Sequence, residues 1–159
     1  GNSSMKKFYL AYGSNLNLKQ MEERCNKAIP IGTTLLNDYR LAYKGNEDNN
    51  AYLTIEKCEN STVPLGIFAI TSHDEKALDQ YEGYPEFYYK EYIPIQVNGK
   101  IKEAMIYIMN NEYDYHLPSN IYVTTCEKGY EDFGFNKKIL NEALEYTKKE
   151  KAKRKTLKL

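Results

Sequence analysis

The 159-residue sequence contains no tryptophan, two histidines and three cysteines. His73 and His116 each lack a second ligand at a spacing typical of metal sites, so we expect no zinc site. Cys25, Cys58 and Cys126 are widely separated and form no Cys-x-x-Cys pair. An odd number of cysteines without a signal peptide predicts a reducing compartment, and we expect the protein to be cytoplasmic.

Net charge and long apolar segments are also missing. The 22 Lys and Arg residues balance 22 Asp and Glu residues, so no whole-chain field favours nucleic acid or an anionic membrane. No apolar run approaches the about 18 residues needed to span a bilayer. We therefore expect neither a nucleic-acid partner nor a membrane. Positive charge gathers in residues 148–159, and the simplest interpretation of this basic tail is a solvated helix end with cations at its negative pole.

The length favours one domain spanning residues 1–159, since a chain of this size can bury a core without dividing. Gly1 to Ser4 precede Met5, and we interpret them as a cloning remnant outside the fold. Sixteen tyrosines contrast with the missing tryptophan. Tyrosine packs its ring and also offers a hydroxyl, so these side chains either line a half-polar cavity or simply build the core. Composition leaves both interpretations open.

The apolar pattern predicts more strands than helices. Asn98-Gly99 is the strongest hairpin signal, because both residues tolerate positive φ. Strands are expected at residues 7–12, 33–45, 51–57, 63–70, 87–97 and 101–109. Helices are expected after an Asn17 cap, after a capping box at Ser72–Glu75 that ends near Gly83, within 117–134 with an exit at Gly129, and from Asn136.

This order of elements favours an α+β fold. Strands outnumber crossover helices, so a small mixed β-barrel of about five to seven strands, flanked by helices, fits better than a doubly wound sheet. The pattern shows no internal repeat and no domain boundary. Whether the sheet closes into a barrel is not determined by the pattern.

The first candidate site follows the first strand, in the sequence Tyr12-Gly13-Ser14-Asn15. A glycine just beyond a strand lets a ligand approach the main chain closely. The amide groups at the start of the next helix attract an anion, and Ser14 and Asn15 add a hydroxyl and a carboxamide. The sequence predicts either a carboxylate cradle or a plain strand-to-helix turn with a cap.

The second candidate is Glu82 in LDQYEGYP, residues 78–85. A helical projection places Glu82 at the border of the apolar face and turns Asp79 further toward water. Partial burial and the negative end of the helix dipole both disfavour an ionised carboxylate, so the pKa of Glu82 is expected to be raised. A glutamate of this kind suits a general base near neutral pH. The alternative is a solvated glutamate before a glycine stop.

Taken together, the sequence resembles the γ-glutamylcyclotransferase family, including its AIG2-like bacterial members. YGSNL is followed about 65 residues later by LDQYEG, and MEERC, PSNIY and KGYEDFG extend the resemblance over roughly residues 6–147. The resemblance implies a small β-barrel with flanking helices, whose cavity holds a γ-glutamyl group. The family's catalytic glutamate corresponds to Glu82. The implied substrate-binding residues are Tyr12, Gly13, Ser14, Asn15, Leu16, Tyr89, Tyr107 and Tyr122.

The implied reaction is the cyclisation of a γ-glutamyl amide to 5-oxoproline, with release of a free amine or amino acid. The α-amine attacks the γ-carbonyl within one molecule, which supplies much of the rate. Glu82 moves the proton, and main-chain amides of residues 13–16 bind the carboxylate or the oxyanion. The expected partner is a small γ-glutamyl substrate, no metal or organic cofactor is required, and the protein is expected to be a monomer or a homodimer.

Two rival functions use the same residues differently. An enzyme with Ser14 or a cysteine as nucleophile would need a Gly-x-Ser-x-Gly elbow or a placed histidine, and the sequence has neither. A non-catalytic module that binds an amine or amino acid on the same fold is the sharper rival. Glu82 argues for chemistry, and comparing the wild type with Glu82→Gln would decide. The sequence does not determine the leaving group.

Overall fold

A computed structural model describes residues 7–157 of the chain. The cloning remnant inferred at Gly1 to Ser4 and the last two residues of the basic tail lie outside the described residues. The elements in chain order are β1 (Lys7–Ala11), η1 (Ser14–Leu16, a 3₁₀ turn), α1 (Leu18–Arg24), β2 (Ile29–Glu47), β3 (Asn50–Ile70), α2 (Ser72–Glu82), β4 (Tyr88–Val97), β5 (Lys100–Met109), β6 (Asp114–Tyr115), α3 (Asn120–Phe133) and α4 (Lys138–Leu157).

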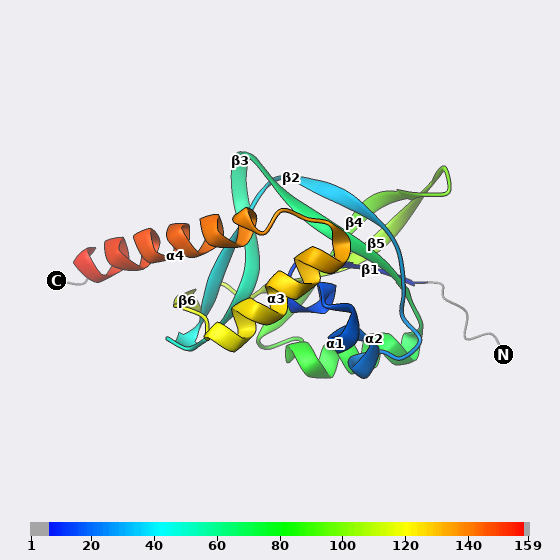
Figure 1. The fold of residues 1–159 in the computed structure, drawn as a ribbon, viewed down its shortest axis with the longest axis horizontal. Coiled ribbons are helices and arrows are strands. Elements are labelled where there is room, and N and C mark those ends of the chain that lie inside the picture. Colours follow the sequence, from blue (N-terminus) through cyan, green and yellow to red (C-terminus); the bar gives the residue numbers. More distant parts are fainter. Residues whose placement is uncertain (1–6, 158–159) are drawn as a thin grey trace.

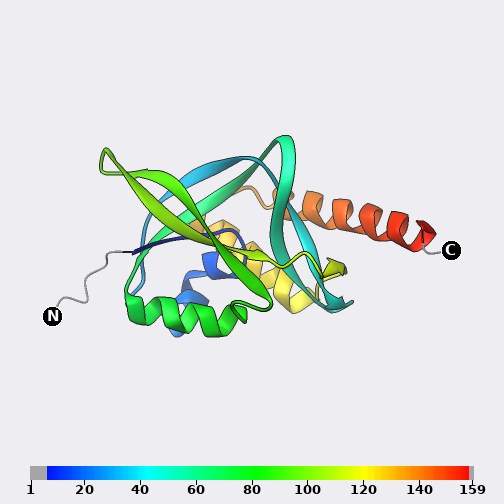
Figure 2. The same ribbon diagram turned by 180° about the vertical axis from the view of Figure 1, so that it is seen from behind.

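The six strands form one curled mixed sheet in the order β4-β5-β1-β3-β2-β6, and helices flank it (Figures 1 and 2). β1 pairs with β3 antiparallel and with β5 parallel, so it lies inside the sheet. Its Leu10 is fully buried, as expected for a strand covered on both faces. The predicted α+β class is confirmed, and the sheet has the form of a half-barrel.

β2 and β3 form one long hairpin, where the sequence predicted three separate strands. The predicted strands at 51–57 and 63–70 are parts of β3, because its pairing with β2 resumes beyond residues 58–61 through a bulge. Asp38 and Asn60 both adopt positive φ there, and the Asn60 amide donates to Asp38 Oδ1 at 2.9 Å. Main-chain pairing tolerates polar side chains on an exposed face, and for that reason the pattern underestimated the strand lengths.

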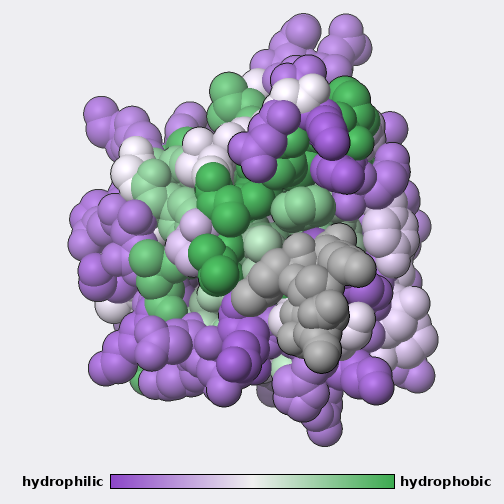
Figure 3. All heavy atoms as spheres, turned by 90° about the vertical axis from the view of Figure 1, so that its right-hand side faces the viewer, coloured by the Kyte–Doolittle hydropathy of each residue, from purple (hydrophilic) through white to green (hydrophobic). Residues whose placement is uncertain are grey.

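The first half of β2 contributes little to the core, although the β3 segment that pairs with it is buried. Ile29, Ile31 and Leu35 of β2 are exposed, whereas Leu41 and Tyr43 further along the same strand are buried. Figure 3 shows the end of the molecule at which β1 and β2 begin, and hydrophobic side chains gather there within a hydrophilic rim. The β2 side chains that reach the core therefore lie in the second half of that strand.

Several local signals act as predicted. Asn17 caps α1 by accepting from the Gln20 amide at 3.0 Å, and Gly83 ends α2 at φ 66°. Asn98 and Gly99 join β4 to β5 at φ 52° and 77°. The capping box of α2 begins one residue earlier than predicted, at Thr71, because Ser72 already lies in the helix. Each signal depends on a few adjacent residues, so it is readable without the fold.

α3 does not end at Gly129, as the sequence predicted, but continues to Phe133 and stops at Gly134 with φ 72°. Gly129 serves close packing instead. A Cβ at this position would stand 2.5 Å from the Asn17 amide nitrogen and 2.7 Å from the Leu16 carbonyl carbon. The absence of a side chain lets α3 lie directly against η1.

α4 extends away from the sheet, with the C-terminus beyond its far end (Figures 1 and 2). Its last turns are exposed, and Arg154 and Lys155 stand in the final turn. Up to residue 157 the basic segment is the solvated helix end that the sequence predicted. Over residues 7–157, no helix combines the length and the apolar character needed to cross a bilayer.

Candidate active site

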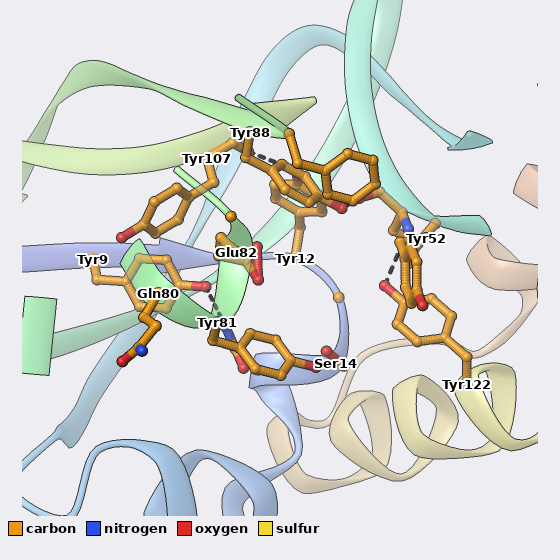
Figure 4. A pocket seen from close by; sticks show the side chains of 15 residues that line it. Tyr9, Tyr12, Ser14, Tyr52, Gln80, Tyr81, Glu82, Tyr88, Tyr107 and Tyr122 are labelled. Atoms are coloured by element: carbon orange, nitrogen blue, oxygen red, sulfur yellow. Dashed lines mark hydrogen bonds between the residues drawn. The ribbon is translucent and has the colours of Figure 1, made fainter. Parts of the chain in front are cut away.

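A pocket of about 330 Å³ opens where β1 ends. The end of β1 and its following loop, β3, the end of α2, the start of β4, β5 and α3 all contribute to its wall (Figure 4). The lining residues are Tyr9, Tyr12, Gly13, Ser14, Asn15, Tyr52, Leu53, Gln80, Tyr81, Glu82, Gly83, Phe87, Tyr88, Tyr107 and Tyr122.

The pairing of the strands explains why Glu82 meets the loop after β1. β3 runs antiparallel to β1 and ends at Ile70 beside Lys7, where β1 begins. α2 then starts and runs back for eleven residues, a rise of about 16 Å. The five residues of β1 span about 16 Å as well. The helix therefore returns Glu82 to the level at which β1 ends.

Glu82 points into the middle of the pocket (Figure 4). Burial among the lining side chains raises the pKa of its carboxyl to about 7, and the nearby positive charge of Arg24 opposes part of that rise. The side chain is half-buried, so it can reach both the protein wall and a ligand. Near neutral pH such a carboxyl can accept or donate a proton.

Gly13, Ser14 and Asn15 line one wall of the pocket, where Gly13 precedes the 3₁₀ turn Ser14–Leu16. The Leu16 amide donates to the Gly13 carbonyl at 3.0 Å, so it cannot also bind a ligand. The amides of Ser14 and Asn15 belong to the first turn, whose N–H groups have no partner within the helix. Of the main-chain amides of residues 13–16 that were predicted to bind an anion, only those that precede Leu16 can therefore do so.

Gly13 is tightly enclosed. A Cβ there would lie 3.3 Å from the Tyr122 hydroxyl and 3.4 Å from a methyl group of Leu53. The Tyr12 carbonyl accepts from the Tyr130 hydroxyl at 3.1 Å, which ties the loop to α3. A rigid loop of this kind holds its polar groups in place before a ligand arrives.

Arg24, at the end of α1, connects this loop to α2. Its guanidinium donates to Asn15 Oδ1, to Gln20 Oε1 and to the Tyr81 hydroxyl, and it contacts Ser14 Oγ at 3.5 Å. The Cζ atom of Arg24 lies 3.5 Å from the centroid of the Tyr81 ring. Arg24 thus holds Ser14 and Asn15 against the helix that carries Glu82.

The tyrosine hydroxyls around the pocket are mostly bound to the protein itself. Tyr12 donates to the Tyr107 carbonyl at 2.6 Å, and Tyr88 donates to the Leu53 carbonyl at 2.8 Å. Tyr107 donates to Asp79 Oδ1 at 2.6 Å, and Asp79 does not line the pocket. Burial raises the pKa of the Tyr12 and Tyr107 hydroxyls, so they stay protonated. The rings rather than charges therefore form much of the wall.

Comparison with known proteins identifies the family. Residues 9–124 match the family model described as gamma-glutamyl cyclotransferase, AIG2-like. The chain belongs to this family. No curated protein matched the sequence.

Solved structures share the cyclotransferase fold. One described as a gamma-glutamyl cyclotransferase is 23% identical with a TM-score of 0.72, and the match covers 92% of this chain and 86% of that one. A human protein described as uncharacterized is 24% identical over the same shares, also with a TM-score of 0.72. YkqA from Bacillus subtilis is 14% identical with a TM-score of 0.68, covering 89% of this chain and 54% of YkqA. At these identities the likeness shows the fold.

Most residues that the sequence singled out in this family member lie together. Tyr12 to Asn15 line the pocket with Glu82, and so do Tyr107 and Tyr122. Leu16 does not line it, because its side chain is fully buried in the core. Tyr89 does not line it either, and the neighbouring Tyr88 takes the place that we had assigned to Tyr89.

The register of the β4-β5 hairpin explains the error at Tyr89. Directly paired residues share a face of the sheet, and Tyr107 pairs with Lys90. Because side chains alternate along a strand, Tyr88 and Lys90 face one side and Tyr89 faces the other. The Asn98-Gly99 turn already implied this register, so the sequence held a signal for Tyr88.

Other lining residues were not singled out from the sequence. Tyr9 lies within an unbroken apolar run, which does not reveal the direction of its side chain. Tyr52 and Phe87 come from separate strands and loops, and Arg24 was quoted only within MEERC. Among residues 7–157, no group of three His, Cys, Asp or Glu side chains comes close enough to hold a metal ion.

The role of Arg24 can be tested without an activity assay. Replacing Arg24 with glutamine removes a positive charge that stabilises ionised Glu82, so the pKa of Glu82 should rise above its wild-type value of about 7. Titration of carboxyl-labelled glutamate by NMR measures this shift. Arg24→Lys keeps the charge and serves as the control, with a smaller shift expected. A downward shift in Arg24→Gln would contradict the electrostatic role.

Proposed function

We propose that this member of the family cyclises a γ-glutamyl amide to 5-oxoproline and releases a free amine or amino acid. The observation that carries the proposal is the placement of Glu82, whose pKa is raised to about 7, in one pocket with the Ser14-Asn15 turn. A proton-transferring carboxyl and a set of anion-binding donors are what an intramolecular aminolysis requires.

In the proposed reaction, ionised Glu82 first takes a proton from the substrate's α-ammonium group. The free amine attacks the γ-carbonyl carbon and forms a tetrahedral intermediate with a five-membered ring. Glu82 then donates its proton to the leaving nitrogen as the old carbon–nitrogen bond breaks. The attacking nitrogen then gives its second proton to the regenerated Glu82 carboxylate, which passes it to the departing amine. The amine leaves as an ammonium ion, so no net proton is consumed or released.

The loop has a binding role in this proposal. The amides of Ser14 and Asn15, with the Ser14 hydroxyl, would hold either the α-carboxylate or the oxyanion that develops on the γ-carbonyl. Because the nucleophile is part of the substrate, the pocket mainly has to hold the chain folded, and the effective molarity supplies much of the rate. The proposed chemistry uses the chain's own side chains and amides.

A screen of γ-glutamyl amides tests the proposal. Purified protein is incubated with amides of different amines and amino acids, and mass spectrometry follows the release of 5-oxoproline. Release that depends on the protein is expected for at least one class of amide. Binding of amides without release would instead favour a non-catalytic binding module on the same fold and would contradict the proposal.

The pH dependence of the reaction follows from the carboxyl of Glu82. Its ionised form is the proton acceptor and its pKa is about 7, so kcat/KM should rise with pH up to about 7. Well below that value kcat/KM should fall about tenfold for each pH unit. A profile of kcat/KM against pH measures this. If the midpoint of the kcat/KM profile instead lay near the pKa of an ordinary exposed glutamate, the group that takes the proton would not be a carboxyl whose pKa is raised by burial.

A further inference from the structure

Aromatic rings stand on both sides of Glu82 in the pocket. Figure 4 draws Glu82 between Tyr9 and Tyr107 on one side and Tyr52 and Tyr122 on the other. The rings of Tyr52 and Tyr122 meet edge to face, with centroids 5.1 Å apart. Phe87 packs against Tyr52 in the same manner at 6.0 Å. We call Tyr52, Phe87 and Tyr122 the aromatic wall.

The polar ends of the aromatic wall are used within the protein. The Tyr122 hydroxyl accepts from the Leu53 amide at 3.0 Å, and the Tyr52 hydroxyl donates to Asn50 Oδ1 at 2.6 Å. Phe87 has no polar atom in its side chain. All three side chains are half-buried, so part of each ring remains open to a ligand. What they offer a ligand is carbon surface.

The pocket also has little charge to offer beyond its catalytic carboxyl. Among the lining residues of the described chain, Glu82 is the single carboxylate and there is no lysine, arginine or histidine. Arg24 stands behind the loop and is held by Asn15, Gln20 and Tyr81. A second carboxylate on a ligand would lose its hydration without gaining an ion pair, which is costly.

We propose that the aromatic wall binds the leaving group, and that the preferred substrates are γ-glutamyl amides of uncharged apolar amines, with aromatic amines best. This inference rests on the proposed cyclisation and adds the substrate class. The anion-binding turn takes the single carboxylate of the γ-glutamyl part, and the aromatic wall takes an apolar group on the amide nitrogen. Burial of an aromatic ring contributes about 1.5–3 kcal/mol, which corresponds to roughly 10- to 150-fold in kcat/KM.

A matched set of substrates tests the inference. The values of kcat/KM for release of 5-oxoproline are compared for the γ-glutamyl amides of ethylamine, 2-phenylethylamine and phenylalanine. We expect the phenylethyl amide to exceed the ethyl amide by about tenfold or more. The phenylalanine amide, which adds a carboxylate, should fall about tenfold or more below the phenylethyl amide. Equal values, or a preference for the carboxylate, would overturn the inference while leaving the cyclisation intact.

Substitutions in the aromatic wall provide a second test of the inference. In Phe87→Ala the ratio of kcat/KM for the phenylethyl and ethyl amides should fall toward one, and Phe87→Leu should lower it less. The ratio does not depend on the fraction of folded protein, so partial unfolding cannot imitate the result.

Tyr92→Ala is the control, since Tyr92 is an exposed aromatic residue outside the pocket, and its ratio should match the wild type. An unchanged ratio in both Phe87 variants would overturn the assignment. Absence of 5-oxoproline from every amide would instead refute the proposed function.

Discussion

Replacing Glu82 with glutamine is expected to lower the release of 5-oxoproline by at least about 100-fold, the usual contribution of a positioned general acid or base. Glutamine has nearly the same shape as glutamate but cannot take up the proton of the attacking ammonium group. Substrate binding by the loop should persist, because Ser14 and Asn15 are unchanged. The measurement is the rate of 5-oxoproline formation under saturating γ-glutamyl amide.

The same substitution makes a prediction about stability, with a defined sign. In the unfolded chain the carboxyl of Glu82 ionises at its ordinary pKa of 4.5, whereas in the folded protein it holds its proton up to about 7. Folding is therefore progressively disfavoured as the pH rises through this window, and the cost persists above it. Glutamine carries no charge, so Glu82→Gln should be more stable than the wild type above pH 7.

Two observations separate loss of chemistry from loss of structure. Urea denaturation at pH 8 should show a midpoint for Glu82→Gln at or above that of the wild type. Glu86→Gln is the matched control, because Glu86 is exposed and does not line the pocket, and it should keep the wild-type rate. A Glu82→Gln protein that cyclises substrate at the wild-type rate would exclude Glu82 as the proton-transfer group.

Replacing Gly129 with alanine is expected to destabilise the protein by about 1–3 kcal/mol, as overpacking of a tight interior does. This change in stability has the opposite sign to the usual one, because replacing glycine with alanine inside a helix normally stabilises a protein by about 1 kcal/mol. The difference arises because the new Cβ would lie 2.5 Å from the Asn17 nitrogen and 2.7 Å from the Leu16 carbonyl carbon. These are backbone atoms and cannot turn away.

The effect of Gly129→Ala should be visible in two measurements. The free energy of unfolding in urea should decrease, and cyclisation should slow, because η1 carries Ser14 and Asn15 and lies against this glycine. Gly32→Ala provides the control, since nothing lies within 4 Å of its added Cβ. A Gly129 variant as stable as the Gly32 variant would refute the close packing of α3 on η1.

Candidate residues chosen by their chemistry were largely found together. Glu82 and the Tyr12-Gly13-Ser14-Asn15 sequence were singled out for residue type and position, and they line one pocket. The predictions were wrong where the direction of a side chain decides whether it reaches the pocket. Tyr89 and Tyr88 are equivalent in composition, and the hairpin register separates them. Leu16 belongs to the matched sequence motif, yet its apolar side chain turns to the core while its neighbours face the pocket.

The sequence by itself determined the features that depend on adjacent residues: the cap at Asn17, the helix end at Gly83 and the turn at Asn98-Gly99. Tertiary structure decided what requires distant segments to meet. The aromatic wall combines residues from three parts of the chain. The pKa of Glu82 is raised to about 7 because the assembled pocket buries its carboxyl. Burial is a property of the assembled pocket, so no short stretch of sequence can specify it.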